Sequence, residues 1–151
     1  MRLIAPHALI SVLVENQEEA LHFYSCILGL EKRNDITFSP GRRLLTVAFQ
    51  GQSRPELALA VPDVSFYGEA YLRSLREQRS HTLSSVFVTH DCAETYAHLL
   101  DCGVTFLSSP TRHLYGMEAL FLDPDGNAFS LLETTTGARS LFKNIFMGTA
   151  A

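Results

Sequence analysis

The sequence has few cysteines and no cysteine motif. Cys26, Cys92 and Cys102 are odd in number and show no C-x-x-C spacing, which argues against a disulfide framework and a zinc knuckle. We therefore expect a reducing, cytoplasmic setting. Positive charge is also scarce, since 12 lysines and arginines against 16 aspartates and glutamates give a net charge of −4. Nucleic acid and anionic membranes are not expected partners.

Long apolar runs and the common enzyme motifs are missing as well. Pro6, His7 and Glu15 interrupt the apolar residues near the N-terminus, and no small-residue cleavage site follows. We expect neither a signal peptide nor a membrane-spanning helix. The chain contains no serine nucleophile elbow and no phosphate-binding glycine-rich loop. Its 151 residues are 46% hydrophobic, which is enough for one compact domain with a core.

A ten-residue segment occurs twice in the chain. Residues 7–16 (HALISVLVEN) and 81–90 (HTLSSVFVTH) are identical at five positions, and the same shift of 74 residues carries Gly29 onto Gly103. Each copy has a strand pattern, a polar turn and then a helical pattern. The repeat predicts an α+β fold built from two tandem βαβββ modules.

The expected boundaries follow from this repeat. Module 1 covers about residues 5–62, a linker helix about 63–80, module 2 about 81–136 and a C-terminal tail 137–151, where Phe142, Ile145 and Phe146 have helical spacing. Asn16 and Asp91 are expected to begin the module helices, and glycines to end them. Residues 34–43 are expected to form a loop. The expected strands are 7–14, a short piece near 30–32, 44–49, 56–61, 82–88, 104–107, 117–122 and 128–133.

Several short motifs carry a family resemblance. They are VLVEN at 12–16, EALHFY at 19–24, LGLE at 28–31, Tyr115-Gly116, and ALFLDPDGN at 119–127. In this order they resemble the vicinal oxygen chelate superfamily, which includes glyoxalases, bleomycin resistance proteins and extradiol dioxygenases. The resemblance covers residues 7 to 135. It implies a cup-shaped, curved eight-stranded mixed sheet with helices outside and a site between the modules.

The resemblance also locates the family's metal ligands. In metal-using members each module gives two ligands to one divalent ion, and these positions fall here on Leu9, Glu56, Leu83 and Ser130. Only Glu56 is a competent ligand, whereas such an ion needs three or four donors. We therefore expect no cofactor. The alternative is a displaced site for Zn, Ni, Mn or Fe, made by His7, Glu56, His81 and Glu118.

Geometry limits that alternative. His7 and His81 precede Leu9 and Leu83 by two residues, which along a strand is about 6.6 Å, several times a metal–ligand bond of about 2 Å. We prefer the interpretation that both histidines cap strand ends.

Strand alternation predicts a mostly apolar inner face with one carboxylate and three hydroxyls. Such a lining suits a small, largely apolar organic ligand. Tyr115, Arg112 and His113 are candidates for its edge, although the preferred interpretation of each is a surface-loop residue without a ligand role. The predicted lining is Leu9, Ser11, Leu13, Glu56, Ala58, Ala60, Leu83, Ser85, Phe87, Ser130 and Leu132.

Two functions remain open from the sequence. The first is a metal-free homodimer that binds a small molecule, of the resistance or sequestration type. The second is a lyase, isomerase or dioxygenase that uses displaced metal ligands or Glu56 as a general base. Glu56 buried in an apolar cup suits a base, whereas Glu56 paired with Arg43 or Arg54 would be structural.

Overall fold

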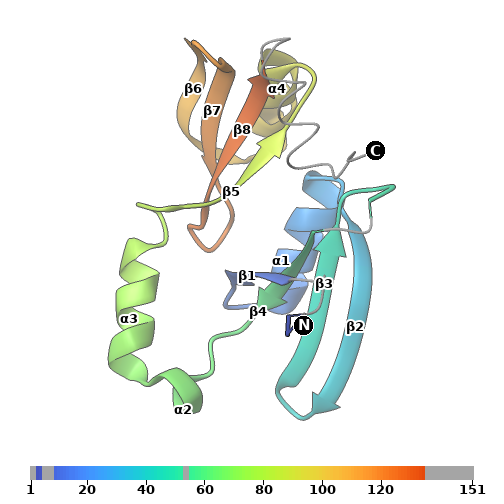
Figure 1. The fold of residues 1–151 in the computed structure, drawn as a ribbon, viewed down its shortest axis with the longest axis vertical. Helices are drawn as coiled ribbons and strands as arrows, with labels where there is room; N and C mark the ends of the chain where they lie inside the picture. Colours follow the sequence, from blue (N-terminus) through green and yellow to red (C-terminus); the bar gives the residue numbers. More distant parts are fainter. Residues whose placement is uncertain (1–2, 5–8, 53–54, 135–151) are drawn as a thin grey trace. The chain divides into compact units, whose positions relative to one another are not determined.

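The computed structural model describes residues 3–4, 9–52 and 55–134 (Figure 1). It divides into two compact units. Unit 1 contains the described residues up to Arg79 together with the turn Asp123–Asn127, and unit 2 contains Ser80–Leu122 and the described residues from Ala128 onward. The predicted tail helix and His7 lie outside the described residues.

Unit 1 contains one four-stranded mixed sheet in the order β1-β4-β3-β2. Strand β1 pairs in parallel with β4, and the other neighbours are antiparallel. Helix α1 runs into the π-helical turn η1 beside this sheet (Figure 1). The bounds are β1 Leu9–Leu13, α1 Gln17–Leu21, η1 His22–Ile27, β2 Glu31–Ser39, β3 Arg42–Ala48, β4 Glu56–Ala60, α2 Val64–Tyr67 and α3 Glu69–Gln78.

Unit 2 repeats the plan with the sheet order β5-β8-β7-β6 and the helix α4. Its first and last strands again pair in parallel. The two sheets confirm the tandem βαβββ prediction. The bounds are β5 Leu83–Val88, α4 Cys92–Asp101, β6 Thr105–His113, β7 Gly116–Leu122 and β8 Ala128–Thr134.

The helix ends form where the sequence predicts them. The side chain of Asn16 accepts a hydrogen bond from the backbone N–H of Glu19, and Asp91 accepts one from the N–H of Glu94. Each bond satisfies an amide that the first helical turn leaves without a partner. Gly29 and Gly103 have φ of +83° and +89°, the left-handed conformation that stops a helix at low cost.

The segment 34–43 is not a loop, so that prediction is wrong. Strand β2 continues to Ser39 and β3 begins at Arg42, which leaves only a tight turn between them. Strand β2 is an edge strand with mostly exposed side chains, so it lacks the apolar alternation that marks a half-buried strand. Strand β6 is likewise longer than predicted and includes Pro110, which an edge strand tolerates. The linker helix is interrupted at Gly68, between α2 and α3.

A buried polar network ties the turn Asp123–Asn127 into unit 1. The hydroxyl of Tyr24 donates to Asp123 Oδ2 at 2.7 Å, and the Asn127 side chain donates to the carbonyl of Leu13 at 2.8 Å. Tyr24 is fully buried, and its pKa is raised by burial and by the nearby Asp123 carboxylate. The phenol therefore stays protonated and keeps donating.

Within the described part of the chain, no helix is long and apolar enough to cross a membrane.

Candidate functional site

The side chains of the unit 1 sheet lie on two faces, which differ in burial. Val12, Val14, Leu57 and Leu59 are fully buried and alternate with the residues of the second face. Strand register places on that second face most of the predicted lining, together with side chains from β2 and β3 that the sequence did not predict. We call it the open face of unit 1: Leu9, Ser11, Leu13, Asn34, Ile36, Leu44, Thr46, Glu56, Ala58 and Ala60.

Glu56 is the carboxylate of this face, and two neighbouring strands hold it. Thr46 Oγ1 donates to Glu56 Oε1 at 2.6 Å, and Asn34 Nδ2 donates to the same oxygen at 2.9 Å. No hydrogen bond from a described residue reaches Oε2. Arg43, a predicted partner, pairs with Asp35 and Glu18 instead. The other predicted partner, Arg54, lies outside the described residues.

Glu118 occupies a different setting in unit 2. Ser130, which is fully buried, donates to Glu118 Oε2 at 2.6 Å, and the Tyr115 hydroxyl donates to Oε1 at 2.9 Å. The hydrogen bond to Glu118 raises the pKa of Tyr115. The ring of His113 stacks on that of Tyr115, with Nε2 3.8 Å from Glu118 Oε1. Both carboxylate oxygens are therefore engaged.

The prediction that Ser85 and Phe87 line the inner face is wrong. Strand β5 pairs Leu83 with Ala128 but Ser85 with Phe129, so its register shifts by one residue. A one-residue shift reverses the face of every later side chain. Phe87 therefore lies in the core of unit 2, stacked on Phe129 with ring centroids 4.9 Å apart.

Other residues of β5 take the vacated positions. Val86 pairs with Ser130 and Val88 with Leu132, and the two valines are 44% and 56% exposed. Leu83, which precedes the shift, remains on the same face as its partner Ala128. No signal in the alternation of β5 marks this shift, because Val and Phe suit either face.

The positions that the resemblance assigns to metal ligands carry few donor atoms in this chain. In unit 1 they are Leu9 and Glu56, and in unit 2 they are Leu83 and Ser130, whose hydroxyl donates to Glu118. Aliphatic side chains supply no donor atom, and Thr46 and Asn34 already occupy one oxygen of Glu56. Among the described residues, no group of three or more His, Cys, Asp or Glu is placed to hold a metal. Of the predicted displaced ligands, His81 is exposed, whereas His7 is not described.

A hollow of about 440 Å³ lies elsewhere in unit 1, beside α1 and η1. One of its acidic residues, Glu18, is paired with Arg43, and the hollow contains none of the predicted site residues. Its lining is Glu18, Glu19, His22, Phe23, Ile27 and Pro124.

Residues 5–131 match the family model of the Glyoxalase/Bleomycin resistance protein/Dioxygenase superfamily. The chain belongs to this superfamily. A protein of Bacillus subtilis (strain 168), the uncharacterized protein YetH, is 30% identical over 124 residues, which are 82% of this chain and 94% of YetH.

Similar solved structures extend the comparison. The crystal structure of UcmS2 is 32% identical, with a TM-score of 0.76 and coverage of 87% of this chain and 98% of that one. TnmS3, described as an antibiotic binding protein from Streptomyces sp. CB03234, is 26% identical, with a TM-score of 0.68 and coverage of 89% and 100%. A superfamily member from Sphaerobacter thermophilus DSM 20745 is 33% identical, with a TM-score of 0.68 and coverage of 87% and 99%.

Proposed function

We propose that this protein binds a small, largely apolar organic molecule in the manner of a resistance or sequestration protein, without the divalent ion that metal-using relatives hold. The observation that carries the proposal is the replacement of family ligands by Leu9 and Leu83, each about half exposed. At these two positions an apolar side chain stands where metal-using members have a metal ligand, so the positions offer contact surface to an apolar molecule. The antibiotic-binding description of the similar TnmS3 supports the same direction.

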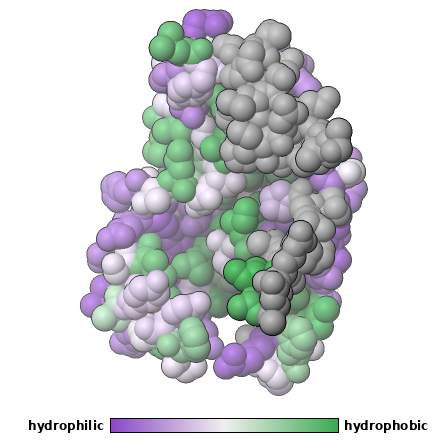
Figure 2. Space-filling view, in the orientation of Figure 1, coloured by the Kyte–Doolittle hydropathy of each residue, from purple (hydrophilic) through white to green (hydrophobic). Residues whose placement is uncertain are grey.

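The chemistry of the sheet faces agrees with ligand binding. Apolar side chains such as Ile36 and Val86 remain exposed among a few fixed polar groups, and the space-filling view shows hydrophobic residues exposed between hydrophilic ones (Figure 2). Apolar surface with a small number of placed polar groups is typical of small-molecule sites.

Metal analysis and a thermal-shift screen test the proposal together. Protein purified without chelators should contain well under one equivalent of Zn, Ni, Mn, Fe or Co, and at least one compound in a panel of metabolites and antibiotics should raise Tm, because a ligand that binds only the folded state stabilises it. Stoichiometric metal that is lost in a His81→Ala variant would overturn the metal-free proposal. A panel without any stabilising compound would overturn the binding role.

The competing role is enzymatic, with Glu56 as a general base. It is favoured by one observation, that Oε1 is held while Oε2 receives no hydrogen bond from a described residue. A general base needs an oxygen that can accept a proton from the substrate. If turnover of any compound is found, Glu56→Gln should abolish it, and an unchanged rate would remove this role.

We also propose that the protein is a homodimer, because two-fold pairs are the commonest soluble homo-oligomers. We propose a cytoplasmic setting because its three cysteines show no disulfide or C-x-x-C pattern. Sedimentation should give twice the chain mass of 16.8 kDa.

A further inference from the structure

We propose that the open face of unit 1 selects ligands that carry a protonated amine, and that Glu56 is the residue that binds this group. The inference rests on the proposed small-molecule function and names the ligand class. Its basis is the distribution of hydrogen bonds around a single carboxylate.

The hydrogen bonds around Thr46 determine which acceptor its hydroxyl proton is donated to. Thr46 Oγ1 accepts from the backbone N–H of Asn34 and from Asn34 Nδ2, each at 3.1 Å. A hydroxyl has two acceptor sites and one proton. With both acceptor sites filled, the proton of Thr46 is directed to Glu56 Oε1 at 2.6 Å.

The side chain of Asn34 has a fixed orientation for the same reason. A carboxylate only accepts hydrogen bonds, so the NH₂ group of Asn34 must face Glu56, which it contacts at 2.9 Å. Two donors from β2 and β3 therefore hold Oε1, and Thr46 is fully buried. These two bonds hold the carboxylate in one orientation, in which no described residue donates to Oε2.

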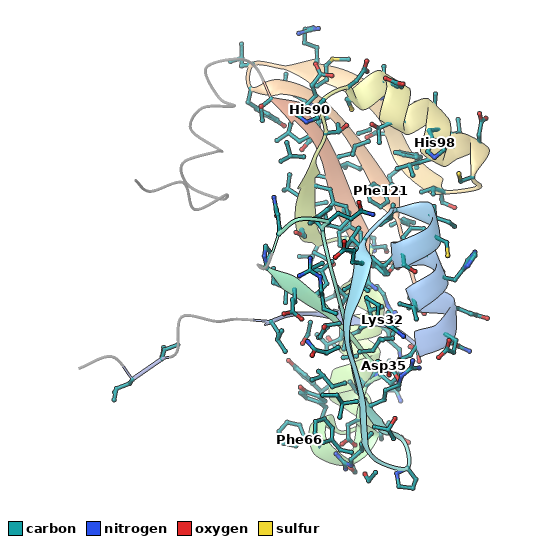
Figure 3. The ribbon with its side chains drawn as sticks, turned by 90° about the vertical axis from the view of Figure 1, so that its right-hand side faces the viewer. Lys32, Asp35, Phe66, His90, His98 and Phe121 are labelled. Atoms are coloured by element: carbon teal, nitrogen blue, oxygen red, sulfur yellow. The ribbon has the colours of Figure 1, made fainter. Side chains whose placement is uncertain are left out.

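The described cations near this sheet are committed to other carboxylates. Arg43 pairs with Asp35 and Glu18, and Lys32 also approaches Asp35 (Figure 3). Their positive charges do not offset the charge of Glu56. The remaining pairs are Arg33 with Glu31, Arg42 with Asp63, and Arg76 and Arg79 with Glu15.

The apolar side chains around Glu56 make its carboxylate discriminate between ligands of different charge. An apolar ligand that covers Leu9 and Ile36 removes water from Glu56, and an unpaired carboxylate is costly to desolvate. An ammonium group on the ligand compensates that cost through a charge-assisted hydrogen bond to Oε2. A neutral ligand leaves the cost uncompensated, and an anionic ligand adds repulsion.

Glu118 is a useful comparison, because its hydrogen bonds leave neither carboxylate oxygen for an ammonium group of a ligand. Tyr115 and Ser130 each donate to a different oxygen of Glu118. Both of its oxygens thereby accept hydrogen bonds within the protein, whereas the described residues donate to only one oxygen of Glu56. A glutamate on the sheet is therefore not enough to define the site. The defining feature is Oε2 of Glu56, which receives no hydrogen bond from a described residue.

Three naphthalene compounds that differ in one substituent test the inference. They are 1-naphthylmethylamine, 1-naphthylmethanol and the carboxylate 1-naphthaleneacetate. The chain has no tryptophan, so naphthalene fluorescence can be followed with the full-length protein at pH 7 and low salt. We expect the amine to bind about tenfold more tightly than the alcohol, about the effect of one charge-assisted hydrogen bond. The acetate should bind more weakly than the alcohol.

Glu56→Gln should remove the preference for the amine while the alcohol still binds. Glu69→Gln removes the same charge from the exposed helix α3 and should keep the preference, which controls for net charge. A poorly folded variant could lose binding for reasons unrelated to Glu56. The ratio of amine to alcohol affinity in the wild-type protein tests the inference without any variant.

The outcomes separate the two proposals. Equal affinities for the amine and the alcohol, or a preference that survives in Glu56→Gln, would overturn the amine inference and leave small-molecule binding standing. Failure of all three compounds to bind at millimolar concentration would count against the proposed function, and the inference would fall with it.

Discussion

The hydrogen bond between Tyr24 and Asp123 allows a quantitative test of the fold. Asp123 accepts four hydrogen bonds: from the N–H groups of Asp125 and Asn127 on Oδ1, and from Asn127 Nδ2 and the Tyr24 hydroxyl on Oδ2. Tyr24 is fully buried and Asp123 is 4% exposed. Water therefore cannot replace the hydroxyl if Tyr24 is changed to Phe.

The expected cost follows from the type of bond. A hydrogen bond to a charged group contributes roughly 1.5–3 kcal/mol. The Phe ring keeps the packing of Tyr24, and Asn127 still donates to Oδ2 at 2.8 Å, so no oxygen loses its last donor. We expect Tyr24→Phe to lower the free energy of unfolding by about 2 kcal/mol, with Tm lower by roughly 4–8 °C.

Urea unfolding at pH 7 measures this difference through the midpoint, with an unchanged m value. Tyr115→Phe is the matched control, because it removes a phenol–carboxylate bond of 2.9 Å from an exposed side chain. Surface changes usually stay within about 0.5 kcal/mol. A Tyr24→Phe variant as stable as the wild type, or two variants with equal losses, would refute the reasoning.

Three further predictions test other parts of the structure. Phe87→Ala should lower the free energy of unfolding by about 3–5 kcal/mol and the exposed Val86→Ala by less than about 1; equal losses in urea unfolding would contradict the shifted register of β5. Arg43 lowers the pKa of Asp35 to about 2, so this pair stabilises the fold above pH 4, and the stabilisation is lost as the pH falls toward 2. Asp35→Asn should flatten the acid limb of a stability–pH profile, and a profile parallel to the wild type would refute that assignment. Gly116→Ala should lower stability by about 3 kcal/mol, because its Cβ would overlap a backbone carbonyl of β8 at a φ of +144°; an unchanged Tm would show that β7 and β8 do not approach so closely.

The sequence predicts the architecture well because several independent signals agree. The 74-residue repeat implies duplicated modules, and Asn16, Gly29, Asp91 and Gly103 mark both ends of both module helices. These are local effects, which depend on one side chain and its own backbone. Such effects are visible in the sequence before any tertiary contact forms.

Predictions that depend on strand pairing were less successful. The edge strand β2 shows no apolar alternation, although it pairs with β3 along its length, from Glu31 with Ala48 to Ser39 with Arg42. The shifted register of β5 depends on its alignment with β8. Alternation within one strand predicts two faces, but the partner strand decides which face is which.

The two carboxylates show the same limit at the level of chemistry. Glu56 and Glu118 are both glutamates on strands with apolar neighbours, and the sequence offers no reason to treat their hydrogen bonding differently. Their partners come from other parts of the fold: Asn34 on β2 and Thr46 on β3 donate to one oxygen of Glu56, whereas Ser130 on β8 and Tyr115 in the β6–β7 turn donate to different oxygens of Glu118. Asn34 could not be counted as a partner while residues 34–43 were expected to form a loop. The proposed capacity of Glu56 to bind a donor from a ligand thus depends on the β2–β3 hairpin, and a change at Asn34 or Thr46 should alter ligand selection without touching the carboxylate itself.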